Sequence, residues 1–184
     1  MLNSLENGQF FSEYEIERLR ELGLWQESHT TPEKLAFGGL MLAPIMQVDM
    51  SDSMTSANEF TTIEEFVRRI EVDFEIATEE DLESIGTEMG LLPMVPATWD
   101  TQKFMTARAM LAGALERLTE PEANHVRNAL AKAVLDVARV GSGHILGLHH
   151  ITKSEKPLIH EIVHELRLET TGEGLHLMDK TRIS

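Results

Sequence analysis

Apolar residues recur at helical spacing along most of the chain, and no stretch alternates convincingly as a strand does. The first helical stretch opens at Ser12, where a capping box with Glu15 is expected, and it ends near Leu22, just before Gly23. Glycine after the last apolar position is typical of a helix end. The pattern therefore predicts a short helix near the start of the chain.

The most apolar stretch follows Thr31 and Pro32, a pair typical of a helix start because proline at the first helical position loses no needed N–H. Apolar side chains surround this stretch on nearly all sides as far as Met50, which predicts a central buried helix. Pro44 lies inside the stretch and is expected to kink the helix, because proline removes one backbone hydrogen bond.

Capping residues and helix breakers divide the following chain into further elements. The next helix is expected to begin within residues 58–62, where Thr61 and Glu64 offer a capping box. A short acidic helix over 78–89 and an extended, proline-containing connector over 91–97 follow.

Three more helices are predicted in the second half. Thr98 or Asp100 begins the first, Thr119 begins the second, which ends near Val140, and Ser154 caps the last. The residues expected on the buried face of the first of these helices are Phe104, Met105, Ala107, Leu111 and Leu115.

These elements predict an all-α fold of about seven helices. A chain of 184 residues is consistent with one domain. Residues 1–30 supply the N-terminal helix and an anchor, 31–168 the main helical domain, and 169–184 a loosely held tail. Within the main domain, Ala36–Phe66 and Leu130–Leu168 follow the same plan of apolar helix, polar elbow and second helix. We interpret them as two pseudo-symmetric units.

Charge and composition narrow the range of functions. The net charge is −15, so the phosphate backbone of a nucleic acid would be repelled, whereas basic proteins and metal cations suit this surface. The chain has no cysteine, which rules out disulfides and thiolate zinc sites. No apolar run approaches the roughly 20 residues of a membrane span, and no signal pattern opens the chain. We expect a cytoplasmic protein, and a homo-oligomer is compatible with the sequence.

The segment FGGLMLAPIMQVDMSDSMTSANEF, which begins at Phe37, resembles the first motif of the TerB-like, tellurite-resistance-associated family. In that motif a small apolar helix runs into Asp-Gly, and a glutamate follows seven positions after the aspartate. Asp52 and Glu59 occupy these two places, and Ser53 stands where the family has glycine.

The segment EKPLIHEIVHELRLE is similar to the closing helix of the second family motif, with Glu155 as the motif glutamate. This second motif departs from the family pattern, because Leu148 lies seven positions before Glu155. The adjacent loop offers His149 and His150 in place of Asp-Gly.

The resemblance implies an all-helical domain that binds a metal ion through acidic elbows and works in stress-response assemblies rather than as a catalyst. Calcium prefers carboxylate and carbonyl oxygens, whereas histidines in the second elbow favour zinc. The ligands expected in the first elbow are Asp49, Asp52, Ser53, Asn58 and Glu59, and those in the second are His149, His150 and Glu155. The simpler interpretation is that Asp52 caps a helix and Glu59 favours the positive end of a helix dipole.

His160-Glu161-Ile162-Val163-His164 satisfies the zinc-hydrolase pattern H-E-x-x-H. On a helix the two histidines share one face and can hold Zn²⁺, while Glu161 can activate water. No third ligand stands at a metzincin spacing, and no substrate-aligning strand is predicted. Half-buried histidines that only flank a core are the commoner case.

A di-iron site is a further alternative, because Glu122 with His125, and Glu161 with His164, form two Glu-x-x-His pairs. Such a site also needs one glutamate from each of two further helices, and the central helix has none after Lys34. We therefore prefer a non-enzymatic TerB-like protein that binds a metal ion or a protein partner. A zinc-dependent hydrolase is the second hypothesis, and a protein-interaction module without metal is the third.

Overall fold

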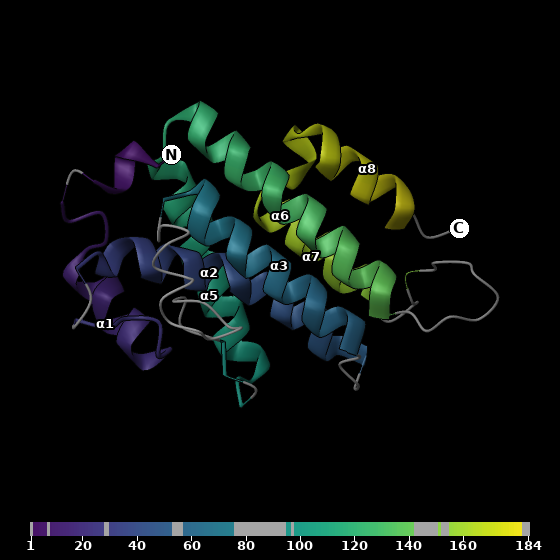
Figure 1. Cartoon of the computed structure of the whole chain (residues 1–184), viewed down its shortest axis with the longest axis horizontal. Helices are drawn as coiled ribbons and strands as arrows, with labels where there is room; N and C mark the ends of the chain where they lie inside the picture. The colour runs from purple at the N-terminus through teal and green to yellow at the C-terminus, as the bar shows by residue number, and fades with distance from the viewer. Residues whose placement is uncertain are drawn as a thin grey trace.

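The computed structural model describes residues 2–6, 8–27, 30–52, 57–75, 95–96, 98–141, 151 and 155–181 (Figure 1). Its α-helices are α1 (Glu13–Glu21), α2 (Pro32–Asp49), α3 (Ala57–Asp73), α5 (Thr101–Arg117), α6 (Glu120–Gly141), α7 (Glu155–Glu165) and α8 (Gly172–Thr181). Three short 3-10 helices are η1 (Asn3–Leu5), η2 (Met50–Asp52) and η3 (Leu168–Thr170). No strand occurs in the described residues, so the predicted all-α class is confirmed. The short helix predicted over 78–89 lies outside them.

Helix α2 is the centre of the fold, as its apolar surface predicts. All residues from Leu35 to Ile45 are buried, and α2 packs against α3, α5, α6 and α7. Figure 1 shows α2, α3 and α6 running alongside one another, with α5 crossing them steeply. A helix that is apolar on all sides has to be covered on all sides, and these neighbours make a single compact domain. None of the described helices is both long enough and apolar enough to cross a membrane.

Local capping signals set most helix starts. Ser12 and Glu15 form the predicted capping box of α1. Asp100 rather than Thr98 is the N-cap of α5, and its carboxylate accepts a hydrogen bond from the backbone N–H of Lys103 at 2.9 Å. The capping box predicted at Thr61 is wrong, because α3 begins four residues earlier at Ala57. Nothing between these two positions breaks a helix, so the helix extends to the good helix former alanine.

One buried position of α5 was misassigned. Met105 is exposed, whereas Arg108 is 1% exposed and occupies the apolar stripe together with Phe104 and Leu111. Positions 104, 108 and 111 are separated by four and three residues, which is the spacing of one helical face. The stripe therefore runs through an arginine, and the methionine one residue after Phe104 points outward.

The expectation of a loosely held tail after Glu169 is also wrong for the described part of that segment. Residues Gly172–Thr181 form α8, which packs against α6, α7 and η3, and Leu177 is fully buried. The Thr171 hydroxyl accepts a hydrogen bond from the Gly174 N–H at 3.1 Å and so caps the helix. Gly172 and Gly174 have low helix propensity, so the sequence of this segment does not predict a helix. Packing against the rest of the protein stabilises α8 instead.

Candidate functional site

The first elbow begins at a buried carboxylate. Asp49 is the last residue of α2 and is 2% exposed. The chain then turns through η2, where the Ser51 hydroxyl donates to the Val48 carbonyl at 2.7 Å. The backbone places Asp52 at the end of η2 and Glu59 in the first turn of α3. Ser53 lies outside the described residues, as do the side chains of Asp52, Asn58 and Glu59.

The second elbow ends at a buried carboxylate. Glu155 is the first residue of α7 and is 1% exposed. Its position in the first turn suits a negative charge, because the helix dipole is positive there. His149 and His150 lie outside the described residues. Both Asp49 and Glu155 have further interactions with the chain, so neither is an isolated charge.

No three His, Asp or Glu side chains gather closely enough to hold one metal ion in the part of the chain that the structure describes. That part contains Asp49 and Glu155 but lacks the side chains of the other three preferred ligands, Asp52, Glu59 and His149. The predicted ligand sets therefore remain predictions, although the burial of two of their members is established.

The two histidines of the H-E-x-x-H pattern lie on one side of α7, with ring centroids 6.3 Å apart. His160 is half-buried, and its Nε2 lies 3.2 Å from the Thr181 carbonyl oxygen at the end of α8. His164 is exposed, and its Nδ1 lies 4.0 Å from Glu169 Oε1. One of the two rings thus already has a partner in the C-terminal helix.

Glu161, the candidate general base of that pattern, forms an ion pair with Arg108 of α5. Arg108 Nε also lies 3.0 Å from Glu165 Oε2, one turn further along α7. Burial raises the pKa of Glu165; Arg108 opposes this shift, and the charge of Glu161 adds to it. The ion pair of Glu161 with Arg108 joins α5 to α7, a structural role that the general base of a zinc hydrolase does not require.

The Glu122 and His125 pair of the di-iron alternative is engaged elsewhere. The Glu122 carboxylate accepts hydrogen bonds from Ser4 and from the N–H and hydroxyl of Thr119, while the exposed His125 ring lies 5.1 Å from the Phe74 ring. Burial alone would raise the pKa of Glu122, but these hydrogen bonds outweigh it and lower the pKa to about 2. Glu122 therefore holds the start of α6 in place.

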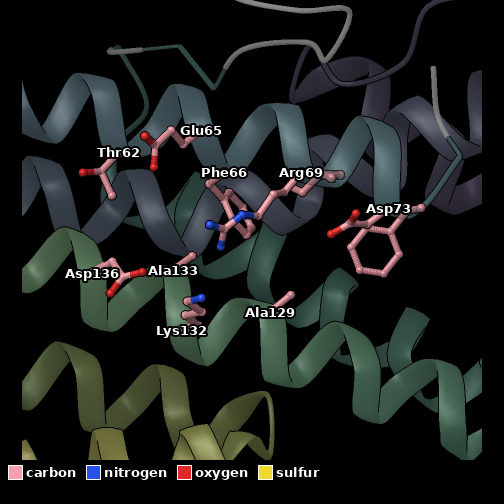
Figure 2. Close-up of a pocket in the computed structure, with 11 residues that line it drawn as sticks. Thr62, Glu65, Phe66, Arg69, Asp73, Ala129, Lys132, Ala133 and Asp136 are labelled. Atoms are coloured by element: carbon pink, nitrogen blue, oxygen red, sulfur yellow. The ribbon is translucent and has the colours of Figure 1, made fainter. Parts of the chain in front are cut away.

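A small pocket of about 60 Å³ lies between α3 and α6. Figure 2 shows side chains of the two helices facing each other across it, with Glu65 and Arg69 on α3 and Lys132 and Asp136 on α6. Charges of both signs border a floor that includes Phe66 and Ala133. Small-molecule sites are typically several hundred Å³, so this pocket suits a single side chain or a few waters.

The fold and these sites define an all-α protein with buried carboxylates at two helix boundaries. Among known proteins, no family model, no curated sequence and no solved structure matches the chain. The resemblance to the TerB-like family accordingly stays a prediction that depends on its two motifs.

Proposed function

We propose that the chain is a non-enzymatic, TerB-like protein of stress-response assemblies that binds a divalent metal ion through its two interhelical elbows and a protein partner through its acidic surface. The helix pairs α2–α3 and α6–α7 are the two pseudo-symmetric units of this proposal. Its support in the fold is that the C-terminal ends of α2 and α6 lie at the same end of the molecule (Figure 1).

The observation that carries the proposal is the burial of Asp49 and Glu155, one in each elbow. Carboxylates are almost never fully buried unless they are paired or coordinate a metal ion. The negative charge of Asp49 is unfavourable for two reasons: the side chain is buried, and it stands at the C-terminal end of α2, where the helix dipole is also negative. Both carboxylates have interactions with the chain, and a cation in the first elbow would add to those at Asp49 and offset both costs.

The donor chemistry separates the two elbows. Carboxylate, hydroxyl and amide oxygens from Asp49, Asp52, Ser53, Asn58 and Glu59 suit calcium, which accepts six to eight oxygen ligands. In the second elbow, imidazoles of His149 and His150 with the Glu155 carboxylate suit zinc. The net charge of −15 favours either cation and a basic partner.

The test is metal content and metal-dependent stability of protein purified without chelator. We expect calcium and zinc each to raise the unfolding temperature, and Asp49→Asn, a variant of the first elbow, to lose most of the increase that calcium gives. Asp100→Asn is the control, because it makes the same substitution at an exposed position outside the elbows, where asparagine still caps α5. Equal calcium responses in the two variants would refute the calcium site, and no response of the wild type to either metal would refute the metal part of the proposal.

A zinc-dependent hydrolase is the second candidate, favoured by His160 and His164 sharing one side of α7. The same samples decide between the two functions. Zinc that is lost in His164→Ala, together with peptide hydrolysis that is lost in Glu161→Gln, would establish the enzyme. We expect neither loss, because Glu161 is paired with Arg108.

A further inference from the structure

A second, larger pocket shares no residue with the elbows. Its volume is about 440 Å³, within the range of small-molecule sites, and it is bordered by the end of α5, the first half of α6 and the turn after α7. Four charged residues line it, together with Asn124 and Thr170: Glu116, Glu120, Arg127 and Arg167. Among the described residues, none of these four forms an ion pair.

Arg127 is the inner cation of this pocket and is 9% exposed. Its Nε donates to the Leu166 carbonyl at 3.2 Å, and its Nη1 donates to Asn124 Oδ1 at 3.4 Å. These two bonds hold the guanidinium in place. Because the group carries five N–H donors, others stay available for a ligand. Burial, and after it the positive charge of Arg167, lowers the pKa of Arg127, although Glu116 and Glu169 act in the opposite direction.

Arg167 is the outer cation, and its backbone is strained. It has φ 55° and ψ 40°, the left-handed conformation in which glycine is the usual residue at a helix end. Its exposed side chain has no hydrogen bond or ion pair among the described residues, and it adds a second positive charge beside Arg127. A left-handed residue and a cation both suit the C-terminal end of a helix, but glycine would take this conformation at lower cost. The arginine side chain thus brings a charge to the pocket that the turn itself does not need.

We propose that Arg127 and Arg167 bind the oxyanion group of a small ligand, a carboxylate or a phosphate. Planar guanidinium groups bind both of these by paired, charge-assisted hydrogen bonds. Glu116 and Glu120 on the same lining disfavour ligands with several negative charges, so the ligand carries one oxyanion group and an otherwise neutral or cationic body. This site shares no residue with the elbows and does not depend on the function proposed for them.

The test is the unfolding temperature of the whole chain, and ligand titration by NMR, with inorganic phosphate and with acetate, each against chloride at constant ionic strength. Stabilisation by phosphate alone identifies a phosphate ligand, and stabilisation by acetate alone identifies a carboxylate ligand. Stabilisation by both anions shows that the site accepts either oxyanion group. Backbone signals of Asn124 and Thr170 are expected to shift in each of these cases. If neither anion stabilises the wild type or moves these signals, the proposal is wrong.

Arg167→Gly is the decisive variant, because it removes a cation and relieves the left-handed strain at once. We expect it to unfold at a higher temperature than the wild type without anion, and to bind the effective anion about ten-fold more weakly. Arg68→Ala, which removes an exposed arginine from α3, is the control and leaves anion binding unchanged. Wild-type anion affinity in Arg167→Gly would overturn the assignment, and its raised unfolding temperature shows that the variant is folded.

Discussion

Glu122, in the first turn of α6, accepts hydrogen bonds from the backbone N–H of Ser4 at 3.1 Å and from the Ser4 hydroxyl at 2.5 Å, although 118 residues separate the two in sequence. The same carboxylate accepts from the N–H and the hydroxyl of Thr119 and so caps its own helix. One side chain thus both begins α6 and fastens η1 to it. Leu2 and Leu5, on either side of Ser4, are buried in the core.

Glu122 makes the free energy of unfolding depend on pH in the acidic range. Its pKa is about 2 in the folded chain and 4.5 in the unfolded chain, so its contribution is complete above pH 4.5 and is lost as the pH falls towards 2. Because the carboxylate is partly exposed, we expect a loss of about 1 to 2 kcal/mol rather than the full value of the shift. Urea unfolding at pH 7 and pH 3 measures it. Glu122→Gln should lose less stability over this range than the wild type, whereas Glu120→Gln should behave as the wild type does.

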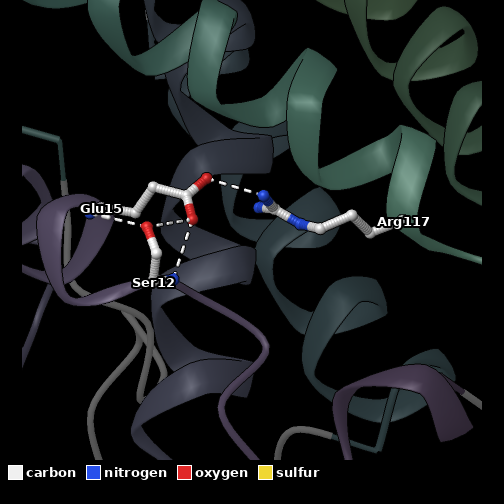
Figure 3. A network of polar contacts seen from close by, with 3 residues as sticks. All are labelled: Ser12, Glu15 and Arg117. Atoms are coloured by element: carbon white, nitrogen blue, oxygen red, sulfur yellow. Dashed lines mark hydrogen bonds and ion pairs between the residues drawn. The ribbon is translucent and has the colours of Figure 1, made fainter.

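Glu15 joins α1 to α5. Figure 3 shows its carboxylate bonded to Ser12, within the capping box, and to Arg117 Nη1, at 2.8 Å. Partial burial would raise the pKa of Glu15, but the bonds from Ser12 and Arg117 lower it. In a double-mutant cycle of Glu15→Gln with Arg117→Met we expect a coupling free energy of about 0.5 to 1 kcal/mol that shrinks in 1 M salt.

The cycle has an internal control, because glutamine at position 15 preserves the capping box while it removes the charge. Arg117→Met should cost more on its own than Glu15→Gln, since the guanidinium also lies 5.1 Å from the Phe10 ring centroid. A coupling free energy near zero at low salt would show that the ion pair does not hold the two helices together.

Removing the two carboxylates that pair with the buried Arg108 is predicted to lower the free energy of unfolding. Glu161→Gln with Glu165→Gln leaves a guanidinium that is 1% exposed without a counter-charge, and we expect the double variant to lose about 2 to 4 kcal/mol of unfolding free energy. Adding Arg108→Met should recover part of this loss, because methionine fills the space without a charge. Chemical denaturation of the wild type, the double variant and the triple variant measures the order of stability, and a triple variant less stable than the double would contradict the prediction.

Local signals explain how far the sequence predicted the fold. The capping box at Ser12 and the all-round apolar surface of α2 depend on residues close in sequence, and both are found as predicted. Of the two N-caps offered for α5, Thr98 and Asp100, the structure has Asp100. Arg108 was missed because its residue type suggested the surface, although its helical position marked it as buried. The bond between Ser4 and Glu122 depends on how distant segments pack, which no local pattern encodes.

The candidate sites were harder to predict from the sequence than the helices, because their contacts join residues that are far apart in the chain. Motif spacing drew attention to Glu161, but its partner Arg108 comes from another helix, 53 residues earlier. The strain at Arg167 leaves no trace in the sequence, because left-handed backbone is expected of glycine and asparagine rather than arginine. Burial of Asp49 and Glu155 likewise follows from the helices that cover them.

The two glycines of α8 test whether this helix docks as closely as the structure shows. A Cβ added at Gly174 would lie 1.8 Å from the Leu168 carbonyl oxygen, whereas one added at Gly172 would meet nothing within 4 Å. Backbone cannot yield as a side chain can, so Gly174→Ala should destabilise the protein by about 2 kcal/mol or more, or release α8 from η3. Gly172→Ala should be neutral or stabilise by about 0.5 kcal/mol, because alanine is the better helix former. Thermal unfolding and amide exchange of α8 compare the pair, and equal stability of the two variants would mean that the C-terminal helix does not pack against η3.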